Sequence, residues 1–123
     1  MAAEPKKTLV LGASANPRRY SYLALKQLRS HGHPVAAIGR KQVMVGDVEV
    51  ATGREPVPGV DTVTLYLNPA NQKEYYDYIL SLHPRRIIFN PGTENPELES
   101  LAAEKGIDTL EACTLVLLGT GQY

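Results

Sequence analysis

Apolar runs alternate with amphipathic segments along most of this chain. Continuous apolar runs, typical of strands covered on both faces, occupy residues 9–11, 35–39, 61–67 and 86–89, and a last strand is expected within residues 109–118. Strands that alternate with helical segments favour a mainly parallel sheet with helices packed on both faces. We therefore predict an α/β fold with about five to six strands.

Three segments carry apolar positions at helical spacing. The first, residues 20–31, stops before Gly32, and its inward face is expected to hold Ser21, Ala24, Leu25 and Leu28. The second follows Asn68-Pro69, and its shared face is expected to hold Gln72, Tyr75, Tyr76, Ile79 and Leu80. The third opens at Asn95-Pro96, stops before Gly106, and is expected to bury Leu98, Leu101 and Ala102.

Residues 40–61 differ from the rest of the chain, because they are rich in Gly, Pro and Val and show no helical period. Two short apolar pieces, at residues 43–45 and 48–50, predict extended structure. The sequence leaves the arrangement of this segment open.

Composition limits the class of protein. The 123 residues fit a single domain with a sizeable core, in which residues 1–6 are expected to be weakly ordered. Thirteen Lys and Arg balance thirteen Asp and Glu, so neither nucleic acid nor a membrane is an expected partner. One cysteine excludes an internal disulfide and a cysteine-based zinc site. Without an apolar run of leader or membrane-spanning length, the expected location is cytoplasmic.

The first predicted strand runs directly into a turn of small residues. Gly12 lets the backbone turn without a Cβ atom in the way, and Asn16 and Pro17 suit the entry to a helix. Free N–H groups at a helix start bind anions, because they point outward and the helix dipole is positive there. The turn therefore indicates a phosphate site.

Asn-Pro pairs recur just beyond predicted strands, at residues 16–17, 68–69 and 90–91. For any one pair, ordinary turn chemistry is a sufficient explanation. Right-handed crossovers nevertheless bring these loops to one edge of the sheet, where open α/β sheets bind their ligands. We therefore expect the ligand site at the carboxyl edge of the sheet.

The residues around the turn restrict the choice of ligand. A dinucleotide turn of the NAD type carries three glycines and an acidic residue after the second strand, whereas here Gly12 stands alone and Arg40 and Lys41 follow that strand. Guanidinium groups match phosphate oxygens in bidentate fashion, so Arg40 suits the extra ribose phosphate of coenzyme A or of NADP. Lys41 is better explained as a solvated loop residue.

The segment from Gly12 to Ser21 has the pattern Gly-Ala-Ser-x-Asn-Pro-x-Arg-x-Ser, which resembles the opening signature of small single-domain CoA-binding proteins. The resemblance continues nearly end to end, through Gly46-Asp47-Val48, Val60-Asp61, Asn68-Pro69, Phe89-Asn90-Pro91-Gly92, Asn95, Gly106-Ile107 and Cys113. Such proteins are similar to the CoA-binding domains of succinyl-CoA synthetase and of NDP-forming acyl-CoA synthetases. The resemblance implies a Rossmann-like, doubly wound fold, while a complete ligase does not fit in 123 residues.

Site residues follow from the resemblance, position by position. It implies that the CoA diphosphate lies among Gly12, Ala13, Ser14, Asn16, Pro17 and Arg19, and that the helix start contributes Ser21 and Tyr22. Near the adenosine it implies Gly39 and Arg40, where relatives often carry an Asn-Pro turn instead. The resemblance also implies that Asn68 and Pro69 line the middle of the crevice. It implies that Asn90, Pro91 and Gly92 flank the pantetheine arm. The thiol end would lie within reach of Cys113.

No catalytic constellation is evident in the sequence. The three histidines, His31, His33 and His83, are expected at the opposite edge of the sheet as solvated or capping residues, and no metal site is predicted. The expected function is therefore non-catalytic binding of CoA or an acyl-CoA. Two alternatives stay open, an NADP-dependent reductase and an interaction subunit with a degenerate nucleotide site.

Cys113 allows two interpretations. A single cysteine in an apolar strand is commonly a small buried hydrophobe. If its thiol faces the crevice, it can instead form a mixed disulfide with CoA, which requires an accessible and partly ionised thiolate. The sequence does not decide between them, and it also leaves the oligomeric state open.

Overall fold

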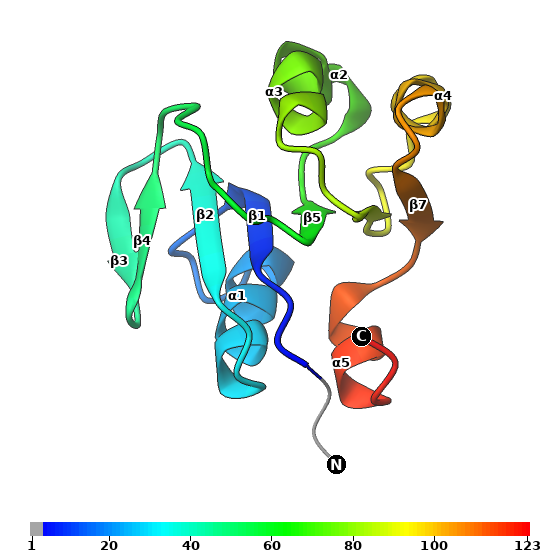
Figure 1. Ribbon diagram of the computed structural model, residues 1–123. Coiled ribbons are helices and arrows are strands. Elements are labelled where there is room, and N and C mark those ends of the chain that lie inside the picture. Colours follow the sequence, from blue (N-terminus) through cyan, green and yellow to red (C-terminus); the bar gives the residue numbers. More distant parts are fainter. Residues whose placement is uncertain (1–3) are drawn as a thin grey trace.

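A seven-stranded sheet with helices on both faces forms the body of the molecule in the computed structural model, which describes residues 4–123 (Figure 1). The strand order is β3-β4-β2-β1-β5-β6-β7, and all neighbouring strands are parallel except β3 and β4. The strands are β1 Thr8–Ala13, β2 Val35–Gly39, β3 Val43–Val45, β4 Val48–Ala51, β5 Thr62–Leu65, β6 Arg86–Phe89 and β7 Asp108–Glu111. The Rossmann-like, doubly wound α/β fold is thus confirmed, with slightly more strands than expected.

The helical elements divide between the two faces of the sheet. They are α1 Tyr20–Ser30, α2 Pro69–Gln72, the 3-10 turn η1 Lys73–Tyr75, α3 Tyr76–Ser81, α4 Pro96–Glu104 and α5 Thr114–Gly119. Helices α1 and α5 cover one face, and α2, α3 and α4 cover the other (Figure 1). This arrangement explains why the central strands read as continuous apolar runs, because both of their faces are buried.

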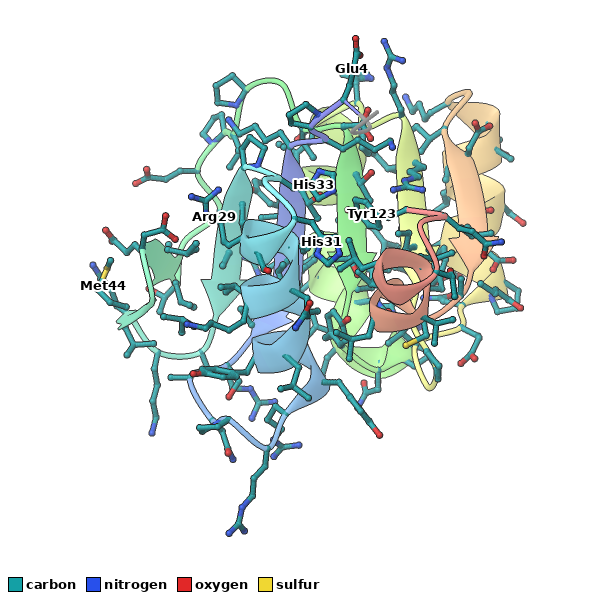
Figure 2. The ribbon with its side chains drawn as sticks, turned by 90° about the horizontal axis from the view of Figure 1, so that it is seen from below. Glu4, Arg29, His31, His33, Met44 and Tyr123 are labelled. Atoms are coloured by element: carbon teal, nitrogen blue, oxygen red, sulfur yellow. The ribbon has the colours of Figure 1, made fainter. Side chains whose placement is uncertain are left out.

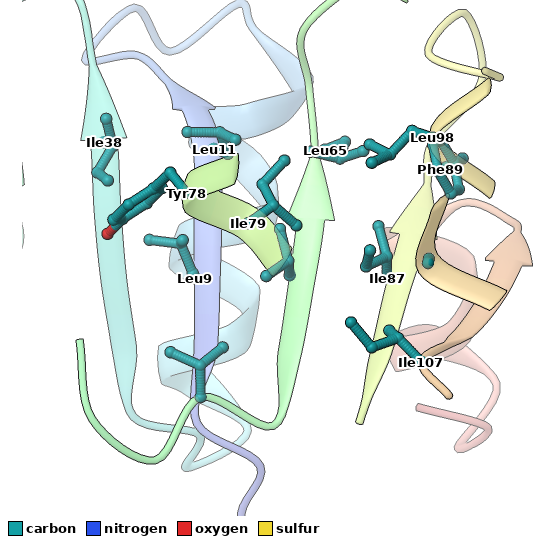
Figure 3. Close-up of a cluster of buried hydrophobic side chains, with 13 residues drawn as sticks. Leu9, Leu11, Ile38, Leu65, Tyr78, Ile79, Ile87, Phe89, Leu98 and Ile107 are labelled. Carbon is teal, nitrogen blue, oxygen red and sulfur yellow. The ribbon is translucent and has the colours of Figure 1, made fainter. Parts of the chain in front are cut away.

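Strand β1 supplies side chains to both cores. Leu9 and Leu11 point into the cluster beneath α3 and α4, where they meet Tyr78, Ile79 and other buried side chains (Figure 3). Val10 points the opposite way, into the cluster beneath α1 and α5. All three side chains are fully buried, as the alternation of side chains along a strand requires.

Helix α1 matches its predicted face, since its buried residues are Ser21, Ala24, Leu25 and Leu28. The expectation that Asn16 and Pro17 form the entry to this helix is wrong. The helix begins at Tyr20 after Arg19, three residues beyond the Asn-Pro turn. Asn16 shapes that turn instead, because its Oδ1 accepts the N–H of Arg18 at 3.0 Å. Asn68 and Asn95 do cap helices, accepting the N–H groups of Asn71 and Leu98.

Two further expectations about elements need correction. The strand expected within residues 109–118 ends at Glu111, and α5 follows, with Cys113 in the N-cap position. Thr114 and Leu118 are four residues apart and both buried, so the apolar run serves a helix face and Cys113 does not lie in a strand. The single helix expected after Asn68 is divided into α2, η1 and α3, although Gln72 and Ile79 still face inward.

The segment before β1 has neither helix nor strand in residues 4–7, and residues 1–3, part of the segment expected to be weakly ordered, lie outside the described residues. The backbone N–H of Lys6 donates to His33 Nδ1 at 2.9 Å, and its Nζ donates to the Tyr123 carbonyl oxygen at 3.0 Å. Within the described chain, no helix has both the length and the apolar character needed to cross a membrane.

Candidate functional site

A cleft of about 880 Å³ lies at the carboxyl ends of β1, β2, β5 and β6. Its volume falls within the range of small-molecule binding sites. The chain order reverses at this place, since β2 lies on one side of β1 and β5 on the other. Ligands of open α/β sheets bind at such a switch point. The cleft is therefore at the edge that the recurring Asn-Pro pairs indicate.

The turn after β1 forms one wall of the cleft. Gly12 has a φ of +95°, and a Cβ atom there would lie 3.0 Å from the carbonyl carbon of Tyr66 and 3.1 Å from the side chain of Leu67. Only glycine fits this approach of β1 to the loop after β5 without strain. Ser14 and Asn16 then fix the turn, because Ser14 Oγ accepts the N–H of Asn16 at 3.0 Å.

The start of α1 presents free donors to the cleft. Within residues 4–123 the backbone N–H groups of Tyr20 and Ser21 have no hydrogen-bond partner, and both residues line the cleft. Arg19 lines it beside them with an exposed side chain. Two outward N–H groups, the positive end of an eleven-residue helix and one guanidinium group together suit a phosphate or diphosphate.

A second cationic region lies after β2. Gly39 allows β2 to approach β1 here, since a Cβ atom would overlap the carbonyl oxygen of Ala13. Arg40 and Lys41 follow, line the cleft and are exposed. The cleft thus has cationic groups at two places, beyond β1 and beyond β2.

The other wall comes from the loops after β5 and β6. Tyr66, Leu67 and Asn68 line the cleft from the first loop, and Pro91, Gly92 and Thr93 line it from the second. These loops carry no cationic side chain. This part of the cleft is therefore less positive than the part formed after β1 and β2.

The comparisons with known proteins give one family. A family model described as a CoA binding domain matches residues 6–119. The chain belongs to the CoA binding domain family. No curated protein matches it significantly.

Solved structures agree with this CoA binding domain fold. An uncharacterized protein with a crystal structure is 51% identical, with a TM-score of 0.95 over 98% of this chain and 100% of that one. A Thermus thermophilus protein is 23% identical, with a TM-score of 0.81 over 97% of this chain and 91% of that one. A hypothetical protein from Pyrococcus horikoshii OT3 is 24% identical, with a TM-score of 0.82 over 91% of this chain and 80% of that one. The similarity to the Thermus thermophilus protein and to the Pyrococcus horikoshii protein shows the fold alone.

Most of the residues expected in the site of this CoA binding domain line the cleft. They are Gly12, Ala13, Ser14, Asn16, Arg19, Ser21, Gly39, Arg40, Asn68, Pro91 and Gly92. The remaining five lie outside its lining: Pro17, Tyr22, Pro69, Asn90 and Cys113. Tyr22 packs against the core beneath α1, and Cys113 is a partly buried free thiol before α5.

Asn90 holds the sheet together instead of facing the cleft. Its side chain is 2% exposed, and its Nδ2 donates to Thr64 Oγ1 at 2.7 Å and to the Leu65 carbonyl oxygen at 2.9 Å. Its Oδ1 accepts the N–H of Thr114 at 2.8 Å. Both amide hydrogens are therefore used within the fold, where they tie the end of β6 to β5, and the amide oxygen ties it to α5.

Several lining residues were not expected from the sequence. They are Ala15, Tyr20, Ile38, Lys41, Val43, Tyr66, Leu67, Asn71, Glu74, Tyr75 and Thr93. The spacing of Asn71, Glu74 and Tyr75 is a signal that could have found three of them, because residues three and four apart share a helix face. Glu74 is paired with Arg54 at 2.8 Å, and the Arg54 guanidinium lies 4.5 Å from the centroid of the Tyr75 ring.

Two titratable side chains that line the cleft, Tyr66 and Glu74, are constrained by their surroundings. The hydroxyl of Tyr66 is buried without a hydrogen-bond partner among the described residues, and burial raises its pKa well above the ordinary value. Glu74 is paired with a cation. In residues 4–123, no group of three His, Cys, Asp or Glu side chains is placed to hold a metal ion.

None of the three histidines lines the cleft, and Figure 2 shows His33 close to Tyr123. His31 follows α1 and His33 precedes β2, while His83 precedes β6. The expectation of a solvated or capping histidine is wrong for His33, which is 6% exposed and whose ring lies 4.9 Å from that of Tyr123. Burial and the nearby charge of Lys6 lower its pKa.

Proposed function

We propose that this domain binds coenzyme A or an acyl-CoA in the cleft, with the diphosphate at the turn between β1 and α1. The observation that carries the proposal is one continuous cleft that joins the free N–H groups of Tyr20 and Ser21 to Arg40 and Lys41. Membership of the CoA binding domain family supports the same ligand.

Each part of the ligand has a group of suitable chemistry in the cleft. The diphosphate would accept hydrogen bonds from the free N–H groups at the start of α1 and an ion pair from Arg19. The ribose phosphate would pair with Arg40, whose guanidinium group can bind two phosphate oxygens. The uncharged pantetheine arm would pass between the loops after β5 and β6, which carry no cationic side chain.

The role we propose is binding without catalysis. Among the described residues, the cleft lining has no histidine and no cysteine, and its one carboxylate, Glu74, is paired with Arg54. General acid–base or nucleophilic catalysis needs a titratable group within reach of the ligand. Tyr66 does not supply a general base, because its raised pKa keeps the hydroxyl protonated at neutral pH.

A thermal-shift panel of CoA, dephospho-CoA, NADPH, NADH and ATP tests the proposed ligand. A ligand at a hundred times its dissociation constant adds about 2.7 kcal/mol to the free energy of unfolding. We expect the largest shift with CoA and a smaller one with dephospho-CoA, which lacks the ribose 3′-phosphate. A larger shift with NADPH would support the reductase instead, and no shift with any nucleotide would support the degenerate interaction subunit.

A further inference from the structure

A fully buried glutamine lies directly behind one wall of the cleft. Gln72 ends helix α2 and is 0% exposed, although it is polar. Its Nε2 donates to the carbonyl oxygen of Leu67 at 2.8 Å and to that of Thr93 at 2.8 Å. A buried amide is costly unless it is hydrogen-bonded, so these two bonds fix where the side chain lies.

The two carbonyl groups belong to different loops. Leu67 lies in the loop after β5 and Thr93 in the loop after β6, and both residues line the cleft. One side chain therefore bridges the two segments between which the pantetheine arm would pass. Gln72 itself does not line the cleft, so it acts on the cleft only through these loops.

A second amide holds Gln72 in this orientation. Asn95 Nδ2 donates to Gln72 Oε1 at 2.9 Å and to the Tyr76 hydroxyl at 2.8 Å. Asn95 is itself fixed, because its Oδ1 accepts the N–H of Leu98 as the cap of α4. With its Oε1 occupied as an acceptor, Gln72 has both amide hydrogens left for the two loop carbonyls.

We propose that Gln72 is a positioning residue that sets the separation of the loops after β5 and β6 and thereby the affinity for the pantetheine part of the ligand. This inference rests on the proposed function. The nucleotide part would be held by the turn after β1 and by Arg40 after β2, and Gln72 makes no hydrogen bond to either segment. Loss of Gln72 should therefore affect the two parts of the ligand unequally.

The test compares two ligands in two variants by isothermal titration calorimetry. CoA contains the pantetheine arm, whereas adenosine 3′,5′-bisphosphate contains the nucleotide part alone. Gln72→Met keeps the length of the side chain and removes its three hydrogen bonds. Gln27→Met makes the same change on the exposed side of α1 and is the matched control. We expect Gln72→Met to weaken CoA binding about tenfold and to leave bisphosphate binding within about twofold. Gln27→Met should change neither affinity.

The proposal is overturned if Gln72→Met weakens both ligands equally, as a purely structural role predicts, or weakens neither. Should Gln72→Met not fold, Asn95→Asp decides on the same criteria, because it keeps the oxygen that caps α4 and removes the amide that orients Gln72. If the natural protein binds neither ligand, the proposed function fails. Amide hydrogen exchange then tests the bridge alone. The bridge predicts that the amide hydrogens of residues 66–68, 92 and 93 exchange faster in Gln72→Met than in the natural protein, and equal rates would overturn it.

Discussion

Gly12 and Gly39 stand where the backbone leaves no room for a side chain. At Gly12 the obstacle is the loop after β5, and at Gly39 it is the carbonyl oxygen of Ala13. The two close approaches bring the ends of β1, β2 and β5 together at the cleft. These glycines therefore shape the site through the backbone and need no contact with the ligand.

Replacing Gly12 should cost more than replacing a glycine that also has a positive φ but lies in open space. Gly59 has a φ of +73° and nothing within 4 Å of an added Cβ, so Gly59→Ala carries the conformational penalty alone. That penalty is about 1–2 kcal/mol. Gly12→Ala adds the contact with Tyr66 and should lower the free energy of unfolding further. Urea denaturation of both variants measures the difference, and equal losses would contradict the close approach.

Arg40→Ala should weaken the binding of CoA and leave that of dephospho-CoA nearly unchanged. Loss of a charge-assisted hydrogen-bonded pair with the ribose phosphate predicts about a tenfold rise in the dissociation constant. Arg85→Ala is the matched control, since Arg85 is an exposed arginine just before β6 whose one ion pair within residues 4–123 is a distant one to Asp61 at 4.0 Å. Titration calorimetry measures the dissociation constants of CoA and of dephospho-CoA for both variants. If Arg40→Ala weakens dephospho-CoA as strongly as CoA, Arg40 does not bind the ribose phosphate.

At the scale of single residues, the sequence was informative where one residue type has a distinctive chemistry. Gly12 and Arg40 could be placed at the cleft from their positions next to predicted strands, and Ser14 and Arg19 from the resemblance to CoA-binding proteins. Asn90 could not be distinguished from a ligand-facing residue, because the sequence does not show that Thr64, Leu65 and Thr114 occupy its side chain. Burial of a polar group depends on neighbours far away in the chain.

Among the elements, continuous apolar runs identified the buried strands well. Strands β2 and β6 have the predicted bounds, because both faces of these strands are covered. The same reasoning gave the wrong element for the apolar run from residue 114 to 118, which was expected to be part of a strand and is helical. A short apolar run is compatible with a buried strand or with a one-sided helix, and packing of α5 beside α1 decides for the helix.

Two acidic side chains, Glu99 on α4 and Glu111 on the edge strand β7, lie close enough to repel each other. Burial, together with the hydrogen bond and negative charge of Glu111, raises the pKa of Glu99. A raised folded-state pKa means that the favourable contribution is present at low pH and is lost as the pH rises. Glu111→Gln should therefore increase the free energy of unfolding at pH 7 by about 0.5 kcal/mol. The gain should vanish near pH 4, and an equal gain at both pH values would show that repulsion is not the cause.

For the molecule as a whole, the strand order determines where the cleft forms. The carboxyl ends of four parallel strands meet at the cleft, and the order reverses between β2 and β5 around β1. The sequence predicted this edge because the Asn-Pro pairs follow three of these strands. It did not predict the wall formed by Glu74 and Tyr75, since the breaks between α2, η1 and α3 depend on tertiary packing.

At the edge of the sheet opposite the cleft, His33 should make the free energy of unfolding depend on pH. The histidine is buried between the segment before β1 and Tyr123, and its pKa is lowered by burial, then by Lys6, His31 and Arg86, with Asp61 acting in the opposite direction. In the unfolded chain His33 becomes protonated near pH 6.5, whereas in the folded protein its lowered pKa keeps it neutral at that pH. The free energy of unfolding should therefore fall as the pH drops below about 6.5.

His33→Asn should remove this pH dependence, because its Oδ1 can accept the N–H of Lys6 without taking up a proton. Urea denaturation at pH 7.5 and 5.5 measures the change, above the range in which the carboxylates titrate. The same fall in both proteins would assign the effect to other groups.

A crystal structure grown with saturating CoA tests the binding of CoA in this cleft most directly. We expect the diphosphate within hydrogen-bond distance of the N–H groups of Tyr20 and Ser21, the ribose 3′-phosphate on Arg40, and the pantetheine arm between residues 66–68 and 91–93. CoA bound away from the carboxyl edge of the sheet, or a cleft without CoA at saturating concentration, would contradict the proposed function.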